Sequence, residues 1–313
     1  MRQTSETIAL GPTGLRLGAI GAGTNTWGGR SASDRSDQDR RATFDALLDA
    51  GVTLFDTAEI YSGGASERTI GRCIHESGRK PVVLTKFFPF PWRLGRRAMR
   101  AALSRSLGRL GLQRVDAYLL HFPWPPVPVE TWADGLADAV EAGLARTVGI
   151  SNCGPALTRR VRAALAARGV PLACNEVELN LLNRAPERSG LLEVCRQLDV
   201  TVIAYRPLAL GTLTGKYSPE HRPGGYRGMM YGRRYLAGSQ PVLSALKSIA
   251  EARGRTMAQI ALNWVLCKGA LPIPGVKSPE QARENAGAMG WRLTATEIAE
   301  LEAVPYHKMP ACL

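Results

Sequence analysis

The amino-acid sequence predicts an α/β protein whose residues 1–313 form one domain, folded as a (β/α)8 TIM barrel. Short apolar runs alternate with amphipathic helical segments along the chain, a pattern typical of parallel βαβ units. Eight of these runs are present, and eight parallel strands close such a barrel. Polar side chains end several of the runs, which is where a barrel of this class gathers its functional residues.

A short β-hairpin over residues 7–17 is expected first, because a Gly-Pro pair and a second glycine separate two apolar runs. The predicted barrel strands are residues 18–23, 53–58, 82–87, 116–121, 146–151, 173–179, 201–206 and 271–276. The predicted helices lie near residues 38–50, 65–77, 95–109, 129–143, 156–168, 187–198, 257–267 and 279–288. Four of these helices are followed by a glycine, which favours the left-handed backbone of a helix end, at Gly51, Gly111, Gly143 and Gly169.

The longest irregular segment, at about residues 207–239, follows the seventh predicted strand and is rich in glycine and arginine. A loop of this length in a compact domain usually has a function of its own. The alternative fold is an open, doubly wound sheet, in which a Gly-x-Gly-x-x-Gly loop opens a helix and binds a dinucleotide. Here Gly21 and Gly23 lead into a loop around Trp27, so the barrel is favoured.

The chain carries a formal net charge of +13, which raises the question of a nucleic-acid partner. Its basic residues are scattered over predicted helices and loops, and no aromatic stacking surface or nucleic-acid-binding motif accompanies them. We therefore expect no nucleic-acid partner. An arginine-rich surface and an anionic cofactor are the favoured explanation of the charge.

Hydrophobic residues make up 45% of the chain and charged residues 21%, as in an ordinary globular protein. No run approaches the roughly 18 apolar residues of a membrane span, and the first six residues lack the apolar core of a signal peptide. Six cysteines show neither a Cys-x-x-Cys pair nor zinc-type spacing, which indicates reduced thiols and no metal site. We expect a cytoplasmic protein without a membrane partner.

Four residue types that together can reduce a carbonyl group lie near the ends of consecutive predicted strands, namely Asp56, Tyr61, Lys86 and His121. A phenol is a poor proton donor at neutral pH, but a neighbouring ammonium lowers its pKa and an imidazole can orient or relay the proton. Tyr61 is therefore the expected acid. Asp56 would pair with Lys86, and His121 would hold the substrate oxygen. Each residue alone could be a loop cap or a solvated charge, but their joint occurrence favours catalysis.

The order of these four residues resembles the catalytic tetrad of the aldo-keto reductase superfamily, and the resemblance extends from Gly23 and Thr24 to Asn285. It implies an NADPH-dependent oxidoreductase that acts on a small-molecule carbonyl substrate. The implied reaction is reduction of an aldehyde or ketone to an alcohol, with Tyr61 as proton donor.

The same resemblance implies a cofactor site spread over the strand ends and the long loop. Its residues are Gly23, Thr24, Ser151, Asn152, Glu176, Tyr205, Arg206, Leu208, Gly211, Lys216, Lys277, Ser278, Gln281 and Asn285. Ser151 and Asn152 match the pair that binds the nicotinamide carboxamide, and Tyr205 matches the aromatic residue that stacks on the ring. A buried core aromatic is the alternative for Tyr205. Leu208, Gly211 and Lys216 resemble the segment along the pyrophosphate, where backbone N–H groups suit phosphate oxygens.

Lys277 and Ser278 precede a predicted helix and resemble the adenosine end of the site. A lysine and a hydroxyl at the beginning of a helix can neutralise a ribose 2′-phosphate through charge and the helix N-terminus together. NADPH is therefore favoured over NADH. The same residues also form an ordinary helix cap followed by proline, and both interpretations can hold at once.

Glu176 and Arg206 stand where the family usually has glutamine and serine. Ionised Glu176 could accept from the carboxamide NH2 but could not donate to its carbonyl. Arg206, on the adjacent strand, could compensate Glu176 as an ion pair. A carboxylate there also raises an alternative function, reduction of an imine or of a cationic substrate.

Aromatic side chains beyond the strand ends are candidates for lining the substrate site, namely Trp27, Phe87, Phe88, Trp92, Phe122 and Trp124. They favour an apolar or aromatic carbonyl compound, although such residues can also simply pack loops. A second class of function is an NADPH-sensing regulatory subunit, because potassium-channel beta subunits share this fold and much of the tetrad. Steady NADPH consumption would separate an enzyme from a sensor.

Overall fold

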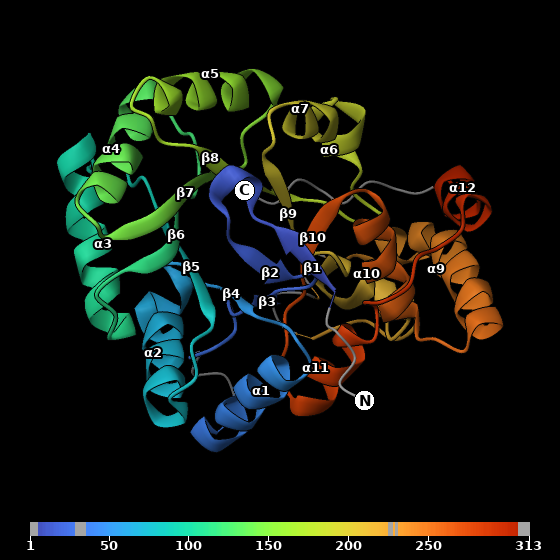
Figure 1. The fold of residues 1–313 in the computed structure, drawn as a ribbon. Coiled ribbons are helices and arrows are strands. Elements are labelled where there is room, and N and C mark those ends of the chain that lie inside the picture. The colour runs from blue at the N-terminus through green and yellow to red at the C-terminus, as the bar shows by residue number, and fades with distance from the viewer. Residues whose placement is uncertain (1–5, 29–35, 225–227, 229–230, 306–313) are drawn as a thin grey trace.

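The computed structural model describes residues 6–28, 36–224, 228 and 231–305. Eight strands form the central sheet, namely β3 (Ala22–Gly23), β4 (Leu54–Asp56), β5 (Val82–Phe87), β6 (Val115–Leu120), β7 (Ala145–Ser151), β8 (Leu172–Glu178), β9 (Thr201–Tyr205) and β10 (Ala270–Ile273). They pair in parallel and in sequence order. Hydrogen bonds of 3.0 Å from Gly21 N to Pro272 O and from Gly23 N to Pro274 O bring the edge strands together. The sheet therefore curls into the predicted barrel (Figure 1).

The predicted hairpin is present as β1 (Thr7–Ala9) and β2 (Arg16–Gly18), which pair antiparallel and lie across the barrel in Figure 1. It covers the amino-terminal end of the strands, because Thr201 Oγ1, at the start of β9, accepts from Gly11 N (2.7 Å) and donates to Ala9 O (2.9 Å). Its side chains Leu10, Leu15 and Leu17 pack against inward-facing residues of the barrel strands. Among these residues are Leu54, Leu84, Leu119, Ile203 and Leu271. This apolar floor leaves the opposite end of the barrel for polar side chains.

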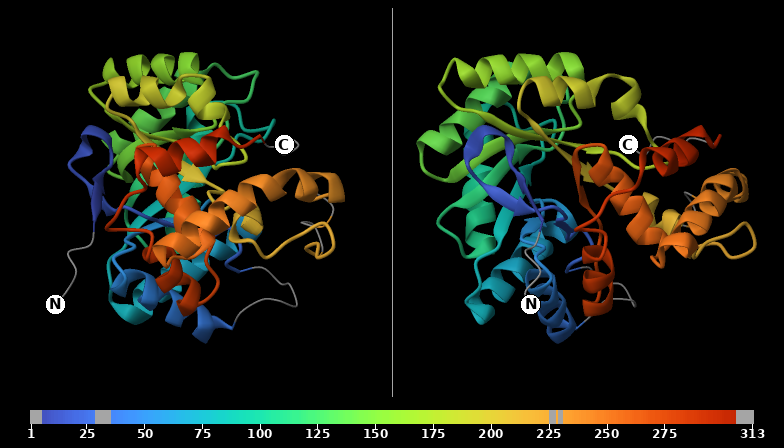
Figure 2. Two further views of the ribbon diagram at one scale, coloured as in Figure 1. Left: turned by 90° about the vertical axis from the view of Figure 1, so that its right-hand side faces the viewer. Right: turned by 45° about the vertical axis from the view of Figure 1, so that its right-hand side comes forward.

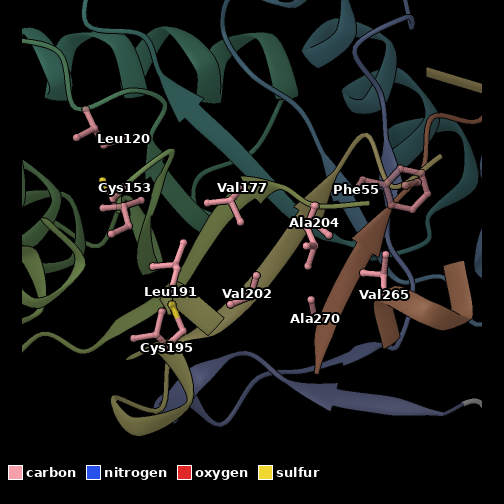
Figure 3. Packing of buried hydrophobic residues seen from close by; sticks show 14 of the residues in the cluster. Phe55, Leu120, Cys153, Val177, Leu191, Cys195, Val202, Ala204, Val265 and Ala270 are labelled. Atoms are coloured by element: carbon pink, nitrogen blue, oxygen red, sulfur yellow. The ribbon is translucent and has the colours of Figure 1, made fainter. Parts of the chain in front are cut away.

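Helices surround the sheet. They are α1 (Asp37–Asp49), α2 (Ala65–Ser77), α3 (Arg96–Leu110), α4 (Val129–Glu141), α5 (Pro155–Ala166), α6 (Ala185–Arg188), α7 (Leu191–Gln197), α9 (Arg233–Arg253), α10 (Met257–Cys267), α11 (Pro279–Ala286) and α12 (Ala295–Ala303). A second core lies between strands and helices. In Figure 3, Val202 of β9 lies near Leu191 and Cys195 of α7, and Ala270 of β10 lies near Val265 of α10. No helix within the described residues is long and apolar enough to cross a membrane.

The long loop is shorter than predicted, because helix α9 begins at Arg233 rather than leaving residues 207–239 irregular. Part of the predicted loop, residues 225–227 and 229–230, lies outside the described residues. Gly232 and Pro241 look like helix breakers in the sequence. However, α9 buries an apolar face that includes Leu236, Val242 and Leu246, and this burial outweighs the poor local propensity. Figure 2 shows α9 beside α12, another helix that the sequence analysis did not predict.

Candidate active site

The four predicted catalytic residues meet at the carboxyl ends of neighbouring strands. Asp56 ends β4, Lys86 lies near the end of β5, and His121 follows β6 directly. Tyr61 begins the short helix η2 (Tyr61–Gly64), which follows β4. Because β4, β5 and β6 are adjacent in the sheet, Asp56 and His121 come together at one edge although they are 65 positions apart in the sequence.

Lys86 lies at the centre of the group and is fully buried. Its Nζ donates to Asp56 Oδ1, to Thr57 O (3.1 Å) and to Tyr61 OH (3.3 Å). Burial by itself lowers the pKa of Lys86, but the neighbouring carboxyl groups of Asp56 and Glu176 hold it above the ordinary value. The ammonium is therefore charged at neutral pH.

Tyr61 keeps its proton for a reason that differs from the prediction. Burial raises the pKa of its phenol, and the opposing effect of Lys86 is too small to reverse this shift. Lys86 does act to lower this pKa, as expected, but burial outweighs it, and Asp56 acts to raise the pKa rather than to lower it. The phenol is a neutral donor in the resting site.

His121 is neutral as well, and its ring lies edge-on to that of Tyr61 with 5.9 Å between the centroids. Burial and the nearby Lys86 lower the pKa of His121 to about 2. Its Nδ1 has no hydrogen-bond partner among the described residues. A neutral imidazole offers one N–H donor and one acceptor, so His121 can present an N–H to an oxygen atom.

The predicted ion pair between Glu176 and Arg206 is wrong. Glu176 Oε2 lies 3.3 Å from Lys86 Nζ, inside the barrel. Arg206 Nη1 donates instead to Glu178 Oε2 at 3.4 Å. Burial raises the pKa of Glu178, and Arg206 only partly offsets this effect. The extra carboxyl group of Glu176 thus belongs to the charges around Lys86.

A row of hydrogen-bonded side chains leads from His121 across the strand ends. Asn152, with a left-handed backbone (φ 59°), donates from Nδ2 to His121 O (3.1 Å) and to Ser151 Oγ (3.0 Å). Its Oδ1 accepts from Tyr205 OH at 3.0 Å. Ser151, Asn152 and Tyr205, predicted for the nicotinamide end, are therefore side by side.

The segment predicted to lie along the pyrophosphate has an unusual backbone. It contains the short helix η3 (Ala209–Thr214), in which Leu210 and Gly211 have positive φ angles. Thr212 Oγ1 is buried without a hydrogen-bond partner in the part of the chain that the structure describes. Since a buried hydroxyl is normally satisfied, this orphaned group fits an anionic ligand such as the NADPH pyrophosphate. Thr212 was not predicted, although it lies in a run of glycine and small polar residues.

At the predicted adenosine end, Ser278 is the N-cap of α11 and its Oγ accepts from Gln281 N at 3.4 Å. Gln281 Oε1 accepts from Lys277 N at 2.9 Å, and Asn285 is buried nearby on the same helix. The ordinary capping interpretation is therefore confirmed, and it leaves phosphate binding as a compatible second role.

Gly23 and Thr24, also predicted for the cofactor site, have structural roles as well. Gly23 lets β3 approach the end of β10, because a Cβ there would lie 3.0 Å from Ile273 O. The Thr24 hydroxyl is fully buried and bonds to Asp56 O at 2.7 Å. The prediction that Trp27 and Phe87 line the substrate site is wrong. Both are buried in the core that faces the helices, where Trp27 Nε1 donates to Val276 O.

The remaining aromatic residues form what we call the aromatic wall, comprising Phe88, Phe90, Trp92, Phe122 and Trp124. It begins at the imidazole of His121, which stacks on Phe122 with 5.0 Å between centroids. Phe122 stacks on Trp124 at 4.8 Å, and Phe88 meets Trp124 edge-on at 5.0 Å. Phe90, stacked on Trp92, was not among the predicted residues. The wall runs outward, since Trp124 is 39% and Trp92 75% exposed.

The barrel thus gathers a buried Lys–Asp pair next to a neutral tyrosine and a neutral histidine at one end, as expected of a barrel enzyme. The profile of the Aldo/keto reductase family matches residues 19–305. The chain therefore belongs to the aldo/keto reductase family.

Three known proteins illustrate the similarity. The chloroplastic pyridoxal reductase of Arabidopsis thaliana is 38% identical, over 95% of this chain and 85% of that protein. The L-glyceraldehyde 3-phosphate reductase of Escherichia coli K12 is 33% identical, over 93% and 90%. An aldo-keto reductase from Klebsiella pneumoniae, crystallised with NADPH, superimposes with a TM-score of 0.79 at 28% identity, over 99% of this chain and 100% of that one. The predicted class, an NADPH-dependent oxidoreductase, is confirmed.

Proposed function

We propose that this protein reduces the carbonyl group of an aldehyde or ketone to an alcohol, with NADPH as reductant and Tyr61 as proton donor. The observation that carries the proposal is the contact of Tyr61 OH with the buried Lys86 ammonium, at 3.3 Å, beside the neutral imidazole of His121. A neutral acid, a fixed cation and a neutral N–H donor thus converge at one point.

NADPH, when bound, supplies the hydride that the carbonyl carbon accepts. Its nicotinamide end would be held by Ser151, Asn152 and Tyr205, whose side chains already lie in a row that ends at His121. The pyrophosphate would contact Thr212 and the left-handed backbone of η3. The adenosine end would lie at the beginning of α11, with Lys277 near the 2′-phosphate.

The side chains of the tetrad have separate roles in the reaction. Tyr61 and the N–H of His121 would both donate hydrogen bonds to the carbonyl oxygen. As that oxygen gains negative charge, the Tyr61 O–H bond breaks and its proton completes the alcohol, leaving a phenolate. Lys86 stabilises this phenolate, and Asp56 keeps Lys86 charged. Water then returns a proton to Tyr61.

A flat aromatic aldehyde such as pyridoxal is the substrate that the aromatic wall supports best. Phe122 and Trp124 present stacked rings that begin at His121, and a planar ring placed there would stack on them. The Arabidopsis relative carries the name of a pyridoxal reductase. A small sugar phosphate, as in the name of the Escherichia coli relative, would leave this wall uncovered.

The two other predicted functions have weaker support. A cationic or imine substrate was motivated by the charge of Glu176, but that carboxyl group is 2% exposed and contacts Lys86. An NADPH-sensing subunit would bind the cofactor without repeated turnover, and nothing in the geometry around Tyr61 favours it.

Steady-state NADPH oxidation over a panel of pyridoxal, benzaldehyde, glyceraldehyde 3-phosphate and cyclic imines tests the proposal. We expect multiple turnovers with aromatic aldehydes and the highest kcat/KM for pyridoxal. Tight NADPH binding without turnover on any member of the panel would reject catalysis and favour a sensor.

A further inference from the structure

Glu176 is a third charged group at Lys86 that the tetrad does not include. Its side chain is buried inside the barrel, with Oε2 3.3 Å from Lys86 Nζ. Its backbone oxygen is fixed from the neighbouring strand end, because it accepts from Ser151 Oγ (2.8 Å) and from Asn152 N (2.9 Å). The side chain is therefore held against the lysine by the same residues that border the nicotinamide end.

Glu176 competes with three other acceptors for the hydrogens of Lys86. An ammonium has three N–H donors, and those of Lys86 go to Asp56, to the backbone oxygen of Thr57 and to Tyr61. Glu176 Oε2 accordingly has no hydrogen-bond partner among the residues that the structure describes. A buried carboxylate that shares its one neighbouring cation with a second carboxylate is disfavoured, so this carboxyl group is more stable with a proton than without one.

The charges around Glu176 lead to the same conclusion. The titratable groups near it are Asp56 of β4, Tyr61 of η2, Lys86 of β5, His121 after β6 and Cys174 of β8. Tyr61, His121 and Cys174 are neutral, so the single cation Lys86 faces two carboxyl groups. Burial, followed by the charge of Asp56, raises the pKa of Glu176 to about 8. Arg206 does not compensate Glu176, because it pairs with Glu178.

We propose that Glu176 holds a proton at neutral pH and positions Lys86 and Tyr61 for reduction only in this neutral form, so that losing the proton slows the reaction. This role of Glu176 rests on the carbonyl reduction proposed above. Tyr61 gains negative charge when it gives up its proton, and a second carboxylate beside Lys86 would oppose that change. Protonated Glu176 is close in shape and in hydrogen-bonding capacity to glutamine, since it has one donor and one acceptor group.

The pH dependence of a single turnover tests this proposal. Enzyme loaded with NADPH is mixed with the best aldehyde of the panel, and NADPH oxidation is followed between pH 6 and pH 10. The wild-type rate should fall about tenfold between pH 7 and pH 9, as expected for a group that ionises near pH 8. In Glu176→Gln, the rate at pH 9 should stay within about twofold of its own value at pH 7.

Glu178→Gln is the matched control, because it makes the same change two residues further along β8, at a carboxyl group that pairs with Arg206. Its rate should still fall about tenfold over the same pH interval, like that of the wild type. A fall that persists in Glu176→Gln, or that disappears equally in Glu178→Gln, would overturn the proposal.

Infrared difference spectra of the cofactor-free protein give a readout that does not need activity. A protonated carboxyl band should disappear with a midpoint near pH 8 in the wild type and in Glu178→Gln, and be absent from Glu176→Gln. Absence of that band from the wild type at pH 6 would overturn the proposal. If the band is present but no aldehyde is reduced at any pH, the proposed function fails and with it the role of Glu176 in reduction.

Discussion

Lys86 is the residue on which the charges of the site depend. Its ammonium is fully buried and touches Asp56, Tyr61 and Glu176. Because burial keeps Tyr61 protonated, Lys86 does not prepare a phenolate in the resting enzyme. In the proposed reaction its positive charge acts later, when Tyr61 would release its proton and become negative.

Removing one partner of the Lys86–Asp56 pair should therefore be costly. Lys86→Met leaves a buried carboxylate unpaired, which should lower the free energy of unfolding by about 3–5 kcal/mol. The double variant with Asp56→Asn should recover part of the loss, with a coupling of about 0.5–3 kcal/mol. Urea unfolding of the four proteins measures this cycle. Strict additivity would contradict a direct pair.

Arg160→Met is the control, because it removes an exposed ion pair with Glu130. It should lower the free energy of unfolding by about 1 kcal/mol or less.

His121 should make stability depend on pH. Its pKa is about 2 in the folded protein and about 6.5 when unfolded, so the unfolded state binds the additional proton as the pH falls below 6.5. The contribution of His121 is fully present above pH 6.5 and is lost on acidification, with a limiting slope of roughly 1.4 kcal/mol per pH unit. Urea unfolding at pH 7 and pH 5 should show a smaller difference in His121→Gln than in the wild type. Equal differences would mean that His121 is not buried as a neutral group.

The positions of the four candidate catalytic residues could be predicted from the sequence, whereas the partners of Glu176 could not. Strand ends are visible as boundaries of apolar runs, and parallel strands bring their ends to one edge. The partner of Arg206 depends on the register of β8 and β9, in which Glu178 lies opposite Tyr205, and on the left-handed backbone of Arg206 (φ 50°). A sequence pattern specifies neither of these.

At the scale of elements, the loop after β5 carries three of the five residues of the aromatic wall and is fixed to the loop that carries Tyr61. Glu59 Oε1 accepts from Phe88 N at 2.8 Å and from Arg93 Nη1 at 2.5 Å. Arg93 in turn lies over the Phe90 ring, 5.0 Å from its centroid. The orientation of Phe88 and Phe90 is thus coupled to the segment that carries Tyr61.

Trp124 should contribute to the binding of aromatic aldehydes. Trp124→Ala removes a stacked ring, and ring stacking is worth about 0.5–1.5 kcal/mol, so kcat/KM for pyridoxal should fall about two- to tenfold. The value for glyceraldehyde should change little, because a three-carbon aldehyde has no ring to stack. Steady-state kinetics with both substrates checks this, and equal losses would show that Trp124 supports the loop rather than the substrate.

The beginning of α11 should select NADPH over NADH. Lys277→Ala removes one charge-assisted contact, worth roughly 1.5–3 kcal/mol, so NADPH should bind about tenfold more weakly or worse. NADH, which lacks the 2′-phosphate, should be affected little. Fluorescence titration with both cofactors measures the two affinities. Equal weakening would assign Lys277 to a role other than phosphate recognition.

Elements with a clear hydrophobic period were predictable, whereas α9 was not. The eight strands lie within a few residues of their predicted bounds, because they are short apolar runs separated by polar turns. In α9, Pro241 and Gly238 interrupt a helical pattern whose stability comes from burial against other helices. Tertiary packing of this kind is not recorded in local propensity.

For the molecule as a whole, the excess of arginine serves contacts between helices. Arg168 pairs with Asp134 (3.3 Å), Asp138 (3.0 Å) and Glu141 (2.7 Å) of α4. Arg96 of α3 reaches Asp138 from the other side at 2.6 Å. These arginines link α3, α4 and the end of α5 on the outside of the barrel, which supports the expectation that the charge reflects an arginine-rich surface.

The hairpin covers one end of the barrel, and Tyr61 lies with the titratable side chains at the other end. Tyr61→Phe removes only the hydroxyl and keeps the ring that lies against His121. Single-turnover NADPH oxidation with pyridoxal should slow by about 100- to 10,000-fold, with NADPH affinity unchanged. A rate within about threefold of wild type at full NADPH occupancy would contradict Tyr61 as the proton donor.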